Sequence, residues 1–153
     1  MANTNQLFWL VNHNSDGSIG TAYYGSSSIN LAVGDGFNGA LKIDYYYIEA
    51  GIYKVQRLGC NYGGGSTVTG FDSNTTSCSS LTLSGNPLLL ITTPIGTPTS
   101  LTISGASVFP LQGEELTAVG TAGNNVKTQI KTRHIYQIPS FFLESITAKN
   151  TIQ

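Results

Sequence analysis

The stretch from Val126 to Ile138 constrains the fold most strongly, because its side chains alternate in type without a break. Successive side chains of a strand point to opposite faces, whereas a helix would mix the two sets. The pattern therefore predicts a long strand with two unlike faces. One face is mostly apolar and holds Val126, Ile130, His134, Tyr136 and Ile138; the other is basic and holds Lys127, Lys131 and Arg133.

The residues before this strand predict its partner. A short strand is expected from Leu116 to Val119, and it is followed by Gly123, Asn124 and Asn125. Gly and Asn tolerate the positive φ angles that tight hairpin connections require. We therefore expect a long β-hairpin whose apolar face is buried, because an exposed apolar strip of this length would aggregate.

The rest of the chain reads as short strands separated by turn residues, with no convincing helix. Turn signals recur every ~8–12 residues, a spacing typical of sandwiches and barrels. We expect one all-β domain over residues 1–153, a jelly-roll-like β-sandwich of about 8–10 short antiparallel strands. The expected strands before the hairpin are 7–11, 19–24, 29–33, 40–48, 52–58, 81–83, 88–92, 101–103 and 107–109, and residues 141–152 could hold a last one.

The charged fraction is the outlier in the composition. It is 10%, where ~25% is usual for a globular domain. Disorder does not explain the value, because the chain has 8 Tyr and 6 Phe and a net charge of only −1. A neutral polar surface suits burial against other subunits. The alternative is a free β domain that happens to be poor in charge.

The N-terminal sequence predicts synthesis in a cytoplasm. Residues 1–14 have no basic n-region, and the apolar run Leu7–Val11 is too short for a signal peptide. No stretch reaches the ~18 apolar residues of a membrane span. There is also no long basic tail, so we do not expect nucleic acid as a partner.

Two segments resemble ligand loops but have simpler interpretations. Residues 12–17 (NHNSDG) offer oxygen atoms at alternate positions, as a calcium loop does, but Tyr23 stands where the acidic twelfth ligand is required. Asp-Gly between two strands is a common hairpin turn, which we favour. Residues 63–65 (GGG) lack the Lys-Ser/Thr of a phosphate loop. We therefore expect no metal and no cofactor.

The two cysteines, Cys60 and Cys78, lie near the two ends of a glycine-rich segment, 59–80, that is expected to be a surface loop. A zinc site has weak support, since there are no other cysteines and the two histidines are far apart in sequence. A disulfide would restrain the loop by ~3 kcal/mol in the chain-entropy model. Two reduced thiols are equally consistent with a cytoplasmic protein.

The remaining candidates point to contact surfaces rather than to catalysis. His134 could pair with a Ser or Asp residue, but nothing in the spacing supports this, so a hydrogen-bonded core or interface histidine is expected. Residues 45–47 (YYY) could stack on sugar rings or bases, although two of the three should face one way and pack. We expect no catalytic residue. The interface candidates are Tyr46 and the cations Lys127, Lys131 and Arg133, which could meet an acidic partner or simply face solvent.

The segment Pro110–Ile138, PLQGEELTAVGTAGNNVKTQIKTRHIYQI, resembles the closing hairpin of small β-sandwich structural proteins of phage and other viral particles. In those proteins an apolar-Gly-Glu turn, a Leu-Thr-Ala strand, a Gly-Thr-Ala-Gly-Asn turn and a long alternating strand ending in Tyr occur together. The resemblance covers this segment alone. It brings no functional residues, because such proteins act through whole surfaces.

The resemblance and the low charge lead to the same functional expectation. We expect a non-enzymatic subunit of a virion or similar assembly, in a capsid, minor capsid or decoration role. It would self-associate or bind other virion proteins and be located in the particle. The alternative is a carbohydrate-binding, lectin-like module that uses Tyr, Asn and Asp side chains of its loops to bind a glycan.

Overall fold

The computed structural model describes residues 5–62, 73–75, 78–97, 99–122 and 126–138. These residues form twelve strands and no helix, so the all-β prediction is confirmed for this part of the chain. Within it, no helix is long and apolar enough to cross a membrane. The chain divides into two compact units, Met1–Pro110 and Leu111–Gln153. The expectation of one domain over residues 1–153 stays a prediction.

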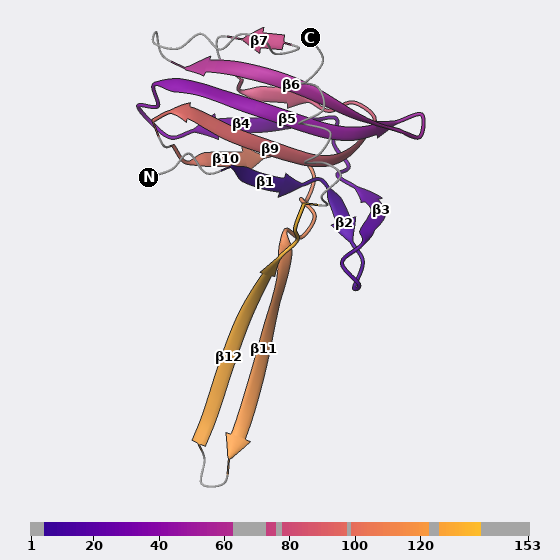
Figure 1. Ribbon diagram of the computed structural model, residues 1–153, viewed down its shortest axis with the longest axis vertical. Coiled ribbons are helices and arrows are strands. Elements are labelled where there is room, and N and C mark those ends of the chain that lie inside the picture. The colour runs from indigo at the N-terminus through magenta and orange to yellow at the C-terminus, as the bar shows by residue number, and fades with distance from the viewer. Residues whose placement is uncertain (1–4, 63–72, 76–77, 98, 123–125, 139–153) are drawn as a thin grey trace, which may run out of the picture. The chain divides into compact units, whose positions relative to one another are not determined.

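The first unit contains a five-stranded sheet in the order β1-β9-β5-β6-β7 (Figure 1). All neighbours pair antiparallel except β6 and β7, which are parallel. Two 11-residue neighbours, β5 and β6, are joined by a tight turn. The strands are β1 (Gln6–Trp9), β5 (Gly39–Glu49), β6 (Ile52–Tyr62), β7 (Ser73–Thr75) and β9 (Asn86–Gly96).

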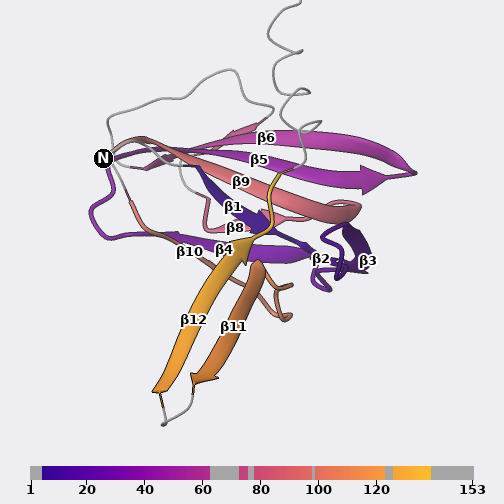
Figure 2. The ribbon, with the colours of Figure 1, turned by 60° about the horizontal axis from the view of Figure 1, so that its bottom comes forward.

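The same unit holds a three-stranded sheet in the order β10-β4-β8, made of β4 (Ser28–Val33), β8 (Ser80–Thr82) and β10 (Leu101–Ser104). Figure 2 shows β4 and β10 in a layer beside the large sheet. A separate hairpin pairs β2 (Val11–His13) with β3 (Ile19–Tyr23). No closed barrel is formed by the described strands.

One hydrophobic core lies where side chains of both sheets meet. The alternation along β5 predicts its inward face correctly: Leu41, Ile43 and Tyr45 are fully buried, and Tyr47 packs against the same cluster. Tyr45 and Tyr47 stack with ring centroids 5.1 Å apart. The large sheet also contributes Leu58, Cys60 and Leu90, and the small sheet contributes Ile29, Leu31 and Leu81.

Several predicted boundaries are wrong. The segment 59–80 is not one loop, because β6 continues to Tyr62 and β7 pairs with it. No strand forms at Ser107–Phe109. Instead, the Phe109 ring stacks on Tyr24 at 4.7 Å, and the Ser107 N–H donates to the Tyr24 hydroxyl at 3.4 Å. The strand suggested within residues 141–152 lies outside the described residues.

The second unit contains the predicted hairpin, made of β11 (Gly113–Ala122) and β12 (Val126–Ile135). Both strands have ten residues and pair antiparallel, with Leu116 opposite Thr132 and Ala118 opposite Ile130. The hairpin is confirmed, but β11 is longer than the expected Leu116–Val119 and β12 ends at Ile135 rather than Ile138. The connecting residues 123–125 lie outside the described part.

The turn between β5 and β6 contains the one described non-glycine residue with positive φ. Glu49 pairs with Ile52, so the loop consists of Ala50 and Gly51, with φ angles of 51° and 77°. Positive φ at both positions is the signature of a type I′ turn, which favours Asn, Asp or Gly. Ala50 adopts this conformation against the steric preference of its Cβ atom.

This turn gives a stability prediction. Ala50→Asn should raise the free energy of unfolding by about 0.5–1 kcal/mol, because Asn tolerates the left-handed region. Gly51→Ala should lower it by about 1 kcal/mol; no atom lies within 4 Å of the added Cβ, so the loss would come from the backbone alone. Urea denaturation of both variants measures this. If both variants shift the midpoint in the same direction, the turn assignment is wrong.

Candidate functional site

The hairpin of β11 and β12 has two unlike faces, which the register assigns residue by residue. Directly opposed residues of antiparallel strands point to the same face. We call the face with Leu116, Ala118, Ile130 and Thr132 the apolar face. We call the opposite face, with Glu115, Lys131 and Arg133, the cationic face; Lys127, opposite Thr121, occupies a position on the same side.

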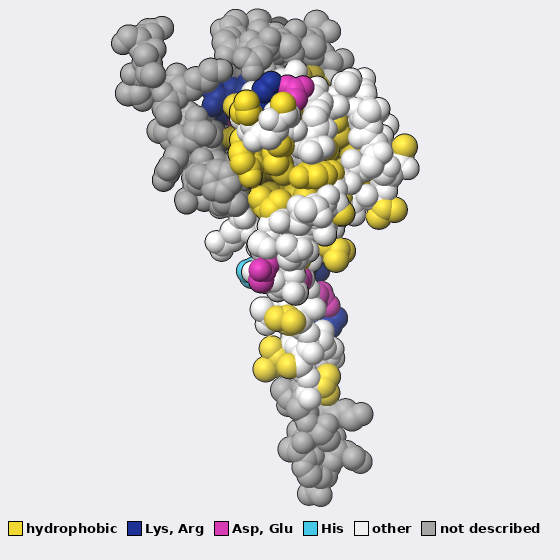
Figure 3. Space-filling view, turned by 90° about the vertical axis from the view of Figure 1, so that its right-hand side faces the viewer, with side chains coloured by type: hydrophobic (Ala, Val, Ile, Leu, Met, Phe, Trp, Pro, Cys, Tyr) yellow, Lys and Arg dark blue, Asp and Glu magenta, His cyan; other side chains and the backbone are white. Residues whose placement is uncertain are grey.

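The expected burial of the apolar face is wrong for its central residues. Leu116 is 63% exposed and Ile130 is 62% exposed, because a two-stranded sheet cannot cover its own faces. Hydrophobic side chains are visible along the hairpin beside acidic and basic ones (Figure 3). Tyr136, beyond the end of β12, is buried as predicted, and its hydroxyl donates to the Glu114 carboxylate at 3.1 Å.

The three cations do not stand alone on their face. Glu115, directly opposite Arg133, lies 3.7 Å from its guanidinium and 3.1 Å from the Lys131 ammonium. These exposed ion pairs contribute little to stability. Because the one carboxylate of Glu115 faces two cations, the face keeps a net positive charge. Glu115 was missed from the sequence because its neighbours across the ladder are known only once the register of the hairpin is fixed.

Tyr46 is not the surface residue that the sequence suggested. It is only 2% exposed, on the side of β5 opposite to Tyr45 and Tyr47. Burial raises the pKa of its hydroxyl to about 12, with a further contribution from the Asp44 carboxylate. β5 is paired on both edges, with β6 and β9, so a side chain at its centre is far from any exposed edge. Tyr46 is therefore withdrawn as an interface candidate.

A buried ionic group lies on the same side of β5 and was also missed. Asp44 is 2% exposed, and its carboxylate lies 2.8 Å from Lys42 Nζ and 3.5 Å from Arg57 Nε. Lys42 and Asp44 are two positions apart, and Arg57 is directly opposite Asp44 on β6. The alternation along β5 places Lys42 and Asp44 on the same side of the strand. Arg57 can be assigned to the group only from the register between β5 and β6. Removing one member of such a group leaves a buried charge without its partner, which is strongly destabilising.

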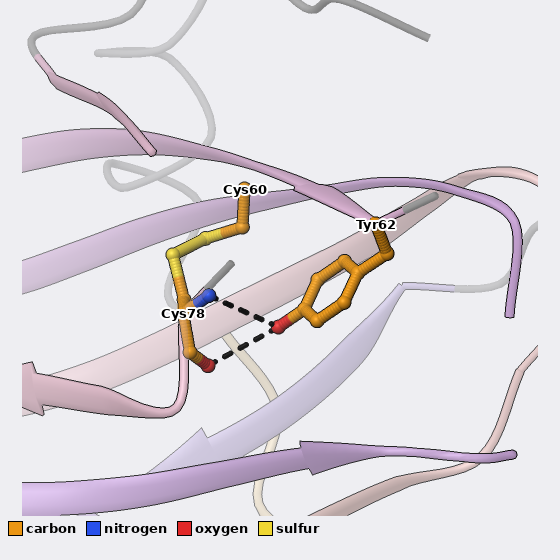
Figure 4. The surroundings of a disulfide bond; sticks show 3 residues. All are labelled: Cys60, Tyr62 and Cys78. Atoms are coloured by element: carbon orange, nitrogen blue, oxygen red, sulfur yellow. Dashed lines mark hydrogen bonds between the residues drawn. A yellow bond between two sulfur atoms is a disulfide. The ribbon is translucent and has the colours of Figure 1, made fainter. Parts of the chain in front are cut away.

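The structure joins Cys60 and Cys78 in a disulfide (Figure 4). Their Cα atoms are 5.6 Å apart, and both residues belong to the hydrophobic core. The Tyr62 hydroxyl donates to the Cys78 carbonyl oxygen at 3.1 Å and accepts from the Cys78 N–H at 3.4 Å. The bridge links β6 to the segment before β8, so it connects strands of the two sheets of the first unit.

The other sequence candidates have structural roles. His134 is exposed, with its ring edge-on to Tyr136 at 6.3 Å, so it is not a core histidine. Asn14–Ser18 forms the predicted turn between β2 and β3: the Gly17 N–H donates to the Asn14 carbonyl at 2.9 Å. The Asp16 carboxylate accepts from the Ser18 hydroxyl and N–H, which lowers the pKa of Asp16. No group of three or more His, Cys, Asp or Glu residues forms a metal site within the described ranges.

No protein-family model, no curated protein and no solved structure matches this chain. The functional interpretation therefore depends on its own surfaces. The most distinctive of these is the hairpin. Leu116 and Ile130 are exposed on its apolar face, and the cationic face carries an excess of cations beside the exposed Val119 and Ile135. Such a surface can form shape- and charge-dependent contacts with another protein.

The disulfide gives a second prediction. Replacing Cys60 and Cys78 with Ala should lower the free energy of unfolding by about 3 kcal/mol, as closing a loop of this length predicts. A reducing agent should lower the melting temperature of the wild type towards that of the double variant and leave the variant unchanged. Thermal denaturation with and without reductant tests this. Equal melting temperatures for the oxidised wild type and the variant would show that the bridge does not stabilise the fold.

A third prediction separates exposed from buried isoleucine. Ile130→Ala should change the unfolding free energy by no more than about 0.5 kcal/mol, because Ile130 is exposed. The matched control is Ile43→Ala on β5, which removes a fully buried side chain and should cost about 2–5 kcal/mol. Both values come from chemical denaturation at low protein concentration. A loss at Ile130 as large as at Ile43 would mean that the hairpin face is covered within a single chain.

Proposed function

We propose that this protein is a non-enzymatic structural protein, a subunit of a virion or similar assembly with a capsid, minor capsid or decoration role. The observation that carries the proposal is the hairpin of β11 and β12, whose central apolar residues Leu116 and Ile130 are more than half exposed. An exposed apolar strip on a long hairpin promotes aggregation of a free chain. In an assembly, the same strip can be buried against neighbouring subunits and stabilise the contact.

The energetics of the hairpin support this proposal. An isolated two-stranded hairpin is marginally stable at best in water. Burying a large aliphatic side chain contributes about 1.5–3 kcal/mol, so covering Leu116 and Ile130 would stabilise both the hairpin and the contact. Assembly would thus complete the packing that the two strands lack by themselves.

The first unit fits the role of a building block. We propose that its two sheets pack as a jelly-roll-like β-sandwich, because Leu41 and Ile43 of the large sheet share one core cluster with Ile29 and Leu31 of the small sheet. The charged fraction of 10% leaves a largely neutral polar surface. Neutral polar and apolar surface is removed from water at lower cost than charged surface when subunits meet.

The proposed partners are further copies of the chain and other proteins of the same particle, and the proposed location is the virion. Mass spectrometry of density-purified particles from the source culture tests the proposal. We expect peptides of this chain at a fixed ratio to the most abundant shell protein. Absence from the particles would overturn the assembly role. Absence combined with selective binding on a glycan array would favour the lectin-like alternative.

A fourth prediction concerns the cationic face. Changing Lys127, Lys131 and Arg133 to Gln should leave stability within about 0.5 kcal/mol, as for most surface substitutions. It should weaken rebinding to particles stripped of this chain, most strongly at low salt, where exposed charges are least screened. Lys54→Gln, which removes an exposed cation of the first unit, is the control. If the triple variant rebinds like the wild type at every salt concentration, this face only meets solvent.

A further inference from the structure

The outer edge of β11 is open. Among the described strands, β11 pairs with β12 alone, over the whole length from Gly113 to Ala122. The main-chain N–H and C=O groups on its other edge therefore have no ladder partner within the described part of the chain. An open edge of this length is a template for another strand, and main-chain hydrogen bonds would supply the affinity.

The charges differ between the two edges of the hairpin. β12 carries Lys127, Lys131 and Arg133 on one face, so two copies of β12 laid side by side would bring like charges together, which is unfavourable. Charged side chains of this kind protect edge strands against pairing. In β11 the only charges are Glu114 and Glu115 near its start, and the stretch from Leu116 to Ala122 has none. The edge of β11 is thus the one suited to a second copy.

We propose that two copies of this chain join their β11 strands edge to edge and antiparallel, around a two-fold axis at Ala118. The proposal rests on the assembly function above and names the partner as an identical chain. In this register Ala118 faces its own copy, and Leu116 lies opposite Gly120. Glu114 and Glu115 lie opposite Ala122 and Thr121, so no carboxylate meets another.

The pairing would close the open edge of β11 and add two strands to the two-stranded sheet. It creates a four-stranded sheet in the order β12-β11-β11-β12, and independent stability requires three or more strands with an apolar face. The axis is perpendicular to the sheet, so the apolar faces of both copies lie on the same side. Leu116, Ala118 and Ile130 of the two chains then form one continuous apolar surface. The contact is isologous and closes as a dimer.

Cysteine cross-linking of the full chain tests this register. Ala118→Cys would place two thiols directly opposite each other, within the range that a disulfide can bridge. Thr132→Cys is the matched control, because it lies on the same exposed face but on β12. Its copy would be three strand spacings away across the sheet, about 14 Å, and further offset along the strands. Under mild oxidation, Ala118→Cys should give at least about five-fold more covalent dimer than Thr132→Cys.

A second pair of variants keeps the test independent of thiol chemistry. Ala118→Lys would oppose two ammonium groups at the axis and should shift the chain from dimer to monomer in light-scattering chromatography, whereas Thr132→Lys should not. Equal cross-linking of the two cysteine variants, or equal association of the two lysine variants, would overturn the pairing. If the pairing fails but the chain is found in particles, the pairing is wrong and the assembly function is retained. Pairing without particle association would refute the assembly function alone.

Discussion

The alternation of side chains along β5 is the constraint on which the first unit depends. Leu41, Ile43 and Tyr45 point into the core shared with the small sheet, while Asp44 and Tyr46 lie on the other side. β5 is paired with β6 on one edge and β9 on the other, and the disulfide from Cys60 connects β6 to the segment before β8. Packing, pairing and the covalent bridge therefore act on the same few strands.

The hairpin shows the same alternation without the same outcome. Leu116 and Ile130 share a face of the hairpin as Leu41 and Ile43 share a face of β5, yet Leu116 and Ile130 remain exposed. β5 meets a second sheet, whereas the two strands of the hairpin have only each other among the described elements. A periodic pattern specifies which residues share a face, and the layer that covers the face has to come from elsewhere. We infer that neighbouring chains supply it.

This distinction explains what could be predicted from the sequence. The strands at 40–48 and 126–138 and the turn at residues 12–17 were found because periodicity and turn chemistry are local signals. The ion pairs of Glu115 and the buried group around Asp44 were missed, because they depend on register between strands. Burial was misjudged at Ile130 and Tyr46, since it depends on tertiary neighbours. The disulfide was one of two open alternatives, because sequence separation alone does not place two thiols side by side.

Hydrogen exchange of the intact chain, measured over a range of protein concentrations, tests most directly whether the hairpin is completed by other chains. Amides that point to the open edge of β11 have no ladder partner among the described strands, so they exchange rapidly unless another strand pairs with them. Protection within Gly113–Ala122 should rise with concentration, while protection of Leu41–Tyr45 in β5 stays constant. Protection of β11 that is the same at every concentration, whether complete or absent, would contradict assembly through this hairpin.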